Sequence, residues 1–247
     1  MKTFKTMLKT ELRLSLRGMD MVIFTICMPL VITIILGILY GEKPAFEGAS
    51  YSFFAQSFAA MPSISICAGG VMGLPLVVSD YQNKKILKRF QVTPISPIMI
   101  LLVQVVIYTL YSVVSFLTTY ITAAIFFGYR MNGSWGEFFW GYLLVLISIF
   151  SIGMMVGGIS QNTKIASIIA SLLYFPMLIF SGATLPYEVM PVGLQKIADI
   201  MPLTQGIKLL KAASLCITVD HVLFPLIFLI FLAIICITIS IRYFRWE

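Results

Sequence analysis

Charged side chains are scarce in this 247-residue sequence. Only 11% of the residues are charged, whereas 60% are apolar; soluble domains usually carry about a quarter charged residues. One soluble core of this size could not hide so much apolar surface. The composition therefore argues against a soluble globular enzyme, a disordered protein and a nucleic-acid binder, and it indicates a membrane protein.

Residues that hold metals or phosphates are also few. The single histidine, His221, cannot build a metal site alone, and we interpret it as an interfacial residue. The four cysteines follow no paired spacing, so we expect buried apolar side chains and neither a disulfide framework nor a zinc site. No G-x-x-x-x-G-K-[ST] phosphate loop occurs. We therefore expect no catalytic, metal or cofactor site in this chain.

Six stretches free of Asp, Glu, Lys and Arg are candidates for membrane spans. A membrane helix needs about 20 apolar residues to cross about 30 Å of hydrocarbon. The third stretch is longer than that, so we expect it to tilt or to project from the membrane. The sequence thus predicts an all-α membrane protein with six transmembrane helices in a single domain over residues 1–247. The predicted spans are Met21–Gly41, Ser52–Ser79, Ile98–Gly128, Phe138–Gly158, Ile165–Phe180 and Val222–Ile241.

Residues 1–18 predict an amphipathic helix that lies in the membrane surface. Apolar residues from Phe4 to Leu16 recur at intervals of three and four and share one helical face, while Lys and Arg residues occupy the other. A frayed basic tail is the alternative interpretation.

The net charge of +7 is distributed unevenly between the two sides of the predicted membrane. Twelve of the seventeen basic residues fall in the two terminal segments and in the loops after spans two and four. The positive-inside rule places that side in the cytoplasm. Both termini are then cytoplasmic, as an even number of spans requires.

Residues 181–221 form the longest interruption between spans. Three prolines divide the segment, and Leu194–Met201 and Ile207–Ile217 look like short amphipathic helices. Irregular backbone at membrane depth survives only when it is buried in protein or lines water. We therefore predict a partly re-entrant outer segment.

The predicted spans contain no ionisable residue, which argues against a proton-driven carrier, a voltage sensor and an intramembrane metal enzyme. Span three instead carries a polar stripe on one helical face. The stripe indicates either hydrogen bonding between helices or one wall of a substrate path. Two G-x-x-x-G pairs, Gly69 with Gly73 and Gly153 with Gly157, favour close helix packing within the chain. The stripe residues are Gln104, Tyr108, Ser112, Ser115, Thr119 and Thr122.

The inner loop at residues 79–97 combines clustered basic residues with apolar ones. We expect a short amphipathic helix that ends near Thr93, because Pro94 disfavours helix in the residue before it. The loop either sets the topology through its charge or docks a cytoplasmic partner. The candidate docking residues are Lys84, Lys85, Ile86, Leu87, Lys88, Arg89 and Phe90.

Two segments resemble the type-two permeases of ATP-binding cassette exporters, and the resemblance covers essentially the whole chain. It implies that residues 79–97 include a coupling helix against an ATPase and that the segment after span five gates the exit. The matching motifs are Leu87-x-x-Phe90-x-Val92-Thr93-Pro94-Ile95-Ser96-Pro97, Phe180-Ser181-Gly182-Ala183-Thr184-Leu185-Pro186, Leu194-Gln195-x-Ile197 and Met201-Pro202-Leu203-Thr204. The implied outer-gate residues are Leu185, Pro186, Met201, Pro202 and Thr204.

The resemblance also implies partners. The chain would pair with a second permease, either identical or a paralogue, above two cassette ATPase subunits that use ATP and magnesium. The sequence departs from the usual family pattern at Asp80–Lys84, where many members have an acidic stretch, and at Met201-Pro202, where many have Asn-Pro. The departures concern the ATPase contacts and the outer gate.

These features predict a permease subunit in the bacterial plasma membrane that exports an amphipathic or hydrophobic substrate. An interior rich in phenylalanine, with 19 in the chain, favours a drug, an antibiotic or an antimicrobial peptide. Export of a lipid or a lipid-linked polysaccharide is an alternative, as is a non-transporting scaffold or immunity protein.

Overall fold

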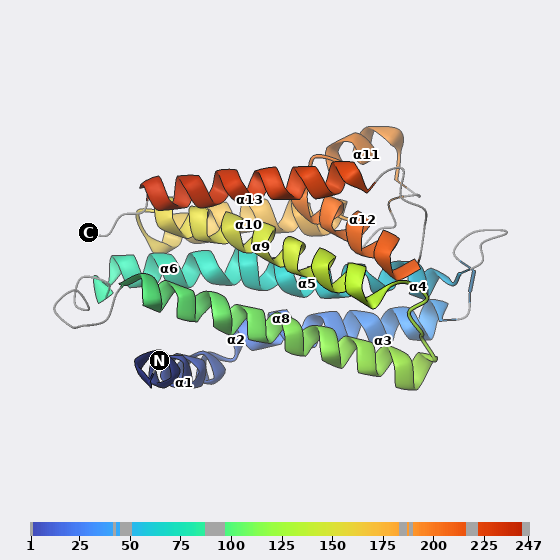
Figure 1. Cartoon of the computed structure of the whole chain (residues 1–247), viewed down its shortest axis with the longest axis horizontal. Helices are drawn as coiled ribbons and strands as arrows, with labels where there is room; N and C mark the ends of the chain where they lie inside the picture. The colour runs from blue at the N-terminus through green and yellow to red at the C-terminus, as the bar shows by residue number, and fades with distance from the viewer. Residues whose placement is uncertain are drawn as a thin grey trace.

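The computed structural model describes residues 2–41, 43–44, 51–86, 97–182, 187, 190–215 and 222–243. Within these ranges the chain is a bundle of helices without β-strands, and six helical stretches are long and apolar enough to span a membrane (Figure 1). The predicted all-α membrane fold is confirmed. The spans are Ile23–Tyr40, Phe53–Asn83, Ile98–Phe127, Trp135–Ile159, Thr163–Phe180 and Leu223–Tyr243.

Helix α1 (Lys2–Gly18) and the last turns of α6 (Leu74–Asn83) and α13 (Leu223–Tyr243) lie at one end of the bundle (Figure 1). We call this the terminal end. The opposite end carries α4 (Phe53–Phe58) and α11 (Val192–Ala198). The long helices α8 (Pro97–Phe127), α9 (Trp135–Ile159) and α13 (Leu223–Tyr243) run between the two ends.

Side-chain caps determine where several helices begin. The Ser134 hydroxyl accepts a hydrogen bond from the Glu137 amide, and the Asn162 side chain accepts one from the Ile165 amide, 2.9 Å away. Such caps satisfy amides that have no partner in the first helical turn. They start α9, after the connection from span three, and α10 (Thr163–Phe180), after the connection from span four.

The amino-terminal segment forms the predicted helix, α1, but its apolar face packs against the protein. Phe4, Met7, Leu8 and Leu12 contact the main hydrophobic core. On the other face Lys5, Lys9, Arg13 and Arg17 are exposed. The apolar periodicity therefore reflects docking onto the bundle as well as the expected placement at a membrane surface.

Two π-helical turns interrupt the first two spans. The first, η1 (Ile23–Cys27), lies between α2 (Asp20–Val22) and α3 (Met28–Tyr40). The second, η2 (Ala68–Gly73), lies between α5 (Ala60–Cys67) and α6. Such turns are rare and frequently occur at functional sites.

Both glycine pairs pack within the chain. A Cβ atom on Gly153 would lie 1.8 Å from the Gly70 carbonyl oxygen, and one on Gly73 would lie 2.4 Å from a ring carbon of Tyr108. The missing side chains let α9 and α8 approach η2 closely, as small residues do in membrane bundles.

The segment after α10 contains two short helices, but their bounds differ from those predicted. The first, α11, ends at Ala198, three residues before the predicted end at Met201. The second, α12, spans Pro202–Leu215 and begins five residues before the predicted start at Ile207. Proline is favoured at the first helical position, so Pro202 starts this helix and does not interrupt it. Most of α12 is buried against α9, α5 and α13, in agreement with a re-entrant segment.

Candidate functional site

The polar stripe of α8 lies inside the folded chain. Gln104, Tyr108, Ser112, Ser115 and Thr119 are all at most 3% exposed. The helices packed on α8 are chiefly α3, α5 and α1, together with the two π-helical turns. Thr122, nearer the opposite end, is half-buried.

Two stripe hydroxyls are buried without a hydrogen-bond partner, those of Ser112 and Ser115. The Thr119 hydroxyl, by contrast, donates to the Ser115 carbonyl at 2.8 Å. Among the described helices, the stripe is therefore buried and makes few side-chain hydrogen bonds to other helices.

A polar cluster joins three helices at the terminal end. The Tyr81 phenol on α6 donates to the Glu11 carboxylate on α1 at 2.5 Å. The Gln104 amide on α8 donates to the same carboxylate oxygen at 2.9 Å and to the Tyr81 oxygen at 3.0 Å. Nearby, the Tyr111 phenol on α8 donates to the Ser15 hydroxyl on α1 at 2.9 Å. Hydrogen bonds to an ionised group are the stronger kind, so Glu11 is the principal polar tie of α1 to the bundle.

Sequence reasoning selected Gln104 but missed its partners. Glu11 is the only acidic residue among the first 18, and it sits on the border between the basic and apolar faces of the helix. Tyr81 lies only three residues before the basic cluster of the inner loop. A single acidic residue in a basic helix could have marked Glu11 as a candidate for a polar contact. Its partners could not be identified from the sequence, because they are 70 and 93 residues away in the chain.

Part of the predicted docking loop is described. Lys84 and Lys85 are exposed just after α6, and Ile86 is half-buried. Lys84 pairs with Asp80 one helical turn earlier at 2.8 Å, and Lys85 has a φ of 53°, which turns the chain away from the helix. The other four candidate docking residues, Leu87, Lys88, Arg89 and Phe90, lie outside the described residues.

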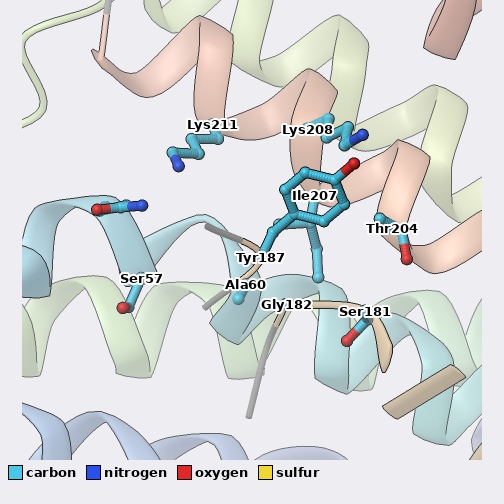
Figure 2. A pocket seen from close by; sticks show the side chains of 10 residues that line it. Ser57, Ala60, Ser181, Gly182, Tyr187, Thr204, Ile207, Lys208 and Lys211 are labelled. Carbon is cyan, nitrogen blue, oxygen red and sulfur yellow. The ribbon is translucent and has the colours of Figure 1, made fainter. Parts of the chain in front are cut away.

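A cavity of about 100 Å³ opens at the opposite end, between span two, the end of span five and α12. Figure 2 shows the Tyr187 ring next to α12, which contributes Thr204, Lys208 and Lys211 to the lining. Ser181 and Gly182, at the end of span five, line the cavity as well.

The predicted outer-gate residues that are described lie at or beside this cavity. Thr204 is 1% exposed, and its hydroxyl donates to the Phe180 carbonyl at 3.4 Å, which ties α12 to the end of α10. Pro202 is buried and Met201 is half-buried at the start of α12. Leu185 and Pro186 lie outside the described residues.

Three residues that sequence reasoning did not select form a polar network beside the cavity. The Tyr187 phenol donates to the two Asp199 carboxylate oxygens at 2.9 and 3.0 Å. Lys208 pairs with Asp199 at 2.5 Å, and its ammonium lies 4.1 Å from the centre of the Tyr187 ring. Burial, followed by the hydrogen bond to Asp199, raises the pKa of Tyr187 above its ordinary value, so the phenol keeps its proton. We call these three residues the outer latch.

The backbone around the outer latch is also held by side-chain amides. Gln195 on α11 donates to the carbonyls of Tyr187 and Met190 at 3.1 and 3.0 Å. Gln205 on α12 donates to the Asp199 carbonyl at 2.6 Å. The segment between spans five and six is therefore folded onto itself, with α12 as its support.

The described residues contain no group of His, Cys, Asp and Glu side chains that could hold a metal ion. The described cysteines Cys27, Cys67 and Cys236 are free, and the last two are buried. The predicted interfacial residue His221 lies outside the described residues.

The comparisons with known proteins identify the family. The family model of the ABC-2 type transporter matches residues 2–215, which include α1, the first five spans and α12. No curated protein and no solved structure matched the sequence. Because the family match covers most of the chain, the protein belongs to the ABC-2 type transporter family, as a membrane-spanning permease component of an ABC transporter and not its ATPase.

Proposed function

We propose that this chain is the permease of an ATP-driven exporter, with both termini in the cytoplasm of a bacterial cell and its membrane domain in the plasma membrane. The family match over residues 2–215 carries this proposal. The cytoplasmic orientation is supported by the excess of basic residues in the segments and loops at the terminal end.

Two cassette ATPase subunits would bind below the terminal end and use ATP and magnesium. The coupling residues would be Lys84–Phe90, which follow α6 in the sequence. The Glu11, Tyr81 and Gln104 cluster supports this role because it ties the last turns of α6 to α1 and α8. A push on the coupling residues would then move three helices together and bias the bundle between two packings.

A second permease, identical or paralogous, would complete the transport path. One face of α10 supports this inference because it leaves a row of large apolar side chains exposed, such as Ile168, Leu172 and Phe175. The buried α8 stripe argues that the path does not run through a single chain. We place the path between two chains, near spans two and five.

The outer gate would consist of Leu185, Pro186, Met201, Pro202 and Thr204, supported by the outer latch. The latch holds the segment after span five against α12, above the cavity. Opening towards the outside would require this segment to move relative to span two.

The proposed cargo is an amphipathic or hydrophobic molecule, with a drug, an antibiotic or an antimicrobial peptide as the first candidates. The uncharged, aromatic-rich core supports this class, because it offers a polar or charged solute few partners. A lipid or a lipid-linked polysaccharide is the second candidate cargo. The alternative function is a non-transporting scaffold or immunity protein.

Reconstitution tests the proposal. The chain is co-purified with a cassette ATPase encoded beside its gene and placed in vesicles. We expect ATP-dependent movement of an amphipathic dye or peptide, together with ATP hydrolysis stimulated by that cargo. If no cassette ATPase binds the chain, or if the complex moves neither an amphipathic dye or peptide nor a lipid, the exporter proposal fails.

A further inference from the structure

A second and larger hollow lies at the opposite end, on the side of the bundle away from the outer latch. This groove has a volume of about 680 Å³ and runs between α9, α12 and α13. Its size falls within the ~300–1,000 Å³ typical of sites for small molecules. Because α9 and α13 are membrane spans, the groove faces lipid.

The groove is polar at its mouth and apolar along its depth. Ser134 and Glu137 lie at the mouth, in the cap and first turn of α9. Leu144, seven residues further along α9, lies about 10 Å deeper. On the facing helix the lining passes from Val222 through Leu226 to Ile230. This gradient matches a molecule with a polar head and a long apolar chain.

Two tryptophans indicate the level in the membrane at which the mouth of the groove lies. Trp140 lines the groove one turn below Glu137 and is 71% exposed, and Trp135 is the first residue of α9. Tryptophan is enriched at the level of the lipid headgroups. The mouth therefore lies where a headgroup would be.

Glu137 gives the mouth its charge. It is the only ionisable residue in the lining, and no described group donates a hydrogen bond to its carboxylate. The residue sits three positions after the cap Ser134, where an acid also favours the start of a helix. A glutamine is also accepted at this position, so Glu137→Gln removes the charge and keeps a residue compatible with the helix start.

We propose that this groove binds a phospholipid with an ammonium headgroup, such as phosphatidylethanolamine, from the membrane leaflet at the opposite end. One acyl chain lies along α13, and the ammonium lies against the Glu137 carboxylate. A lipid with an uncharged glycerol headgroup, such as phosphatidylglycerol, offers no cation to this carboxylate. The proposal does not rest on the proposed function, because it requires neither ATP nor a cargo.

Brominated lipids, which quench tryptophan fluorescence on contact, test the proposal. The full chain, with Trp135 and Trp246 replaced by phenylalanine so that Trp140 alone reports, is placed in vesicles of equal phosphatidylethanolamine and phosphatidylglycerol. Two preparations differ only in which lipid carries bromine on its acyl chains. We expect quenching to favour bromophosphatidylethanolamine about threefold, the size typical of an exposed ion pair.

Three variants make the result specific to the groove. Glu137→Gln should bring the ratio of the two quenching constants to about one, as the carboxylate is lost but the helix start is retained. Ala212→Phe should do the same by filling the groove from α12. Phe139→Leu, on the same turn of α9 but outside the lining, should leave the preference unchanged.

Equal quenching in the starting protein would overturn the proposal, as would a preference that Glu137→Gln leaves intact. Quenching by neither lipid would show that another protein surface covers the groove, and would overturn it too.

Discussion

The Tyr81 phenol on α6 donates a 2.5 Å hydrogen bond to the Glu11 carboxylate on α1, across 70 residues of sequence. This contact joins the amino-terminal helix to the last turns of the helix that leads into the proposed coupling residues. It also makes α1 part of the bundle and not a separate surface anchor.

Replacing Tyr81 with phenylalanine should weaken this junction. The variant loses a hydrogen bond to a carboxylate, worth about 1.5–3 kcal/mol, and the bond that Gln104 donates to the phenol oxygen, but it keeps the bond from Gln104 to Glu11. We expect a lower unfolding temperature in detergent and less transport per ATP hydrolysed. Tyr111→Phe is the matched control, since it loses a neutral bond to Ser15 worth about 0.5–1.5 kcal/mol. If the two variants lost equal amounts of stability and of transport, the hydrogen bond from Tyr81 to the Glu11 carboxylate would have no greater role than the neutral bond.

An acidic residue in the coupling loop should separate ATP hydrolysis from transport. Leu87→Asp and Phe90→Asp each place a charge in the proposed apolar contact with the ATPase, where an unpaired charge is costly. We expect normal membrane insertion and loss of transport. Val192→Asp makes the same kind of change at the opposite end, where Val192 is 70% exposed and belongs to neither the outer latch nor the proposed gate, and should transport normally. Transport that survives in both loop variants would rule out the coupling role.

Ser112→Ala distinguishes the two interpretations of the α8 stripe. The Ser112 hydroxyl is buried without a partner, so its removal should leave the unfolding temperature unchanged or higher. Thr119→Ala should lower it, because its hydroxyl bonds to the Ser115 carbonyl within α8 and a typical hydrogen bond is worth about 0.5–1.5 kcal/mol. We expect normal transport by Ser112→Ala. A stable variant that no longer transports would instead place the stripe on the substrate path.

Gly153→Ala should destabilise the contact between α9 and η2. The added carbon would meet the Gly70 carbonyl oxygen at 1.8 Å, and overpacking of this kind costs about 1–3 kcal/mol. The unfolding temperature in detergent measures the effect. Gly193→Ala on α11 has open space around the new carbon and should be neutral or stabilising, by up to about 1 kcal/mol. If Gly153→Ala left the unfolding temperature unchanged, α9 and η2 could move apart without loss of stability.

The outer latch should be insensitive to pH up to about pH 10, the ordinary pKa of tyrosine. The pKa of Tyr187 is raised in the folded chain, first by burial and then by the hydrogen bond to Asp199. A raised pKa in the folded state contributes stability below the unfolded pKa, and this stability is lost as the pH rises through the folded value.

The measurement is the difference in unfolding temperature between the wild type and Tyr187→Phe across a pH series. We expect a constant difference from pH 7 to 9.5 that shrinks above pH 10. A difference that already falls between pH 7 and 9 would contradict the protonated latch.

The spans were predictable because hydrophobic length is a local property. Each predicted span overlaps one observed helix, and the helices differ mainly where they extend into the charged ends, as α6 does to Asn83. The sequence predicted two short helices between spans five and six, but it did not predict where α12 begins. Pro202 was interpreted as a break, although its ring suits the first position of a helix.

The composition and the distribution of basic residues were sufficient to predict a six-span membrane protein and to suggest its orientation, because membranes select directly for apolar length and for charge at the ends. Tertiary structure alone decided that the α8 stripe is buried and that the apolar face of α1 meets protein. It also brought Glu11 to Tyr81 and Tyr187 to Asp199. Such pairs form when helices that are distant in sequence pack together. The periodicity of one helix predicts which residues share a face, but it does not predict which helix packs against that face.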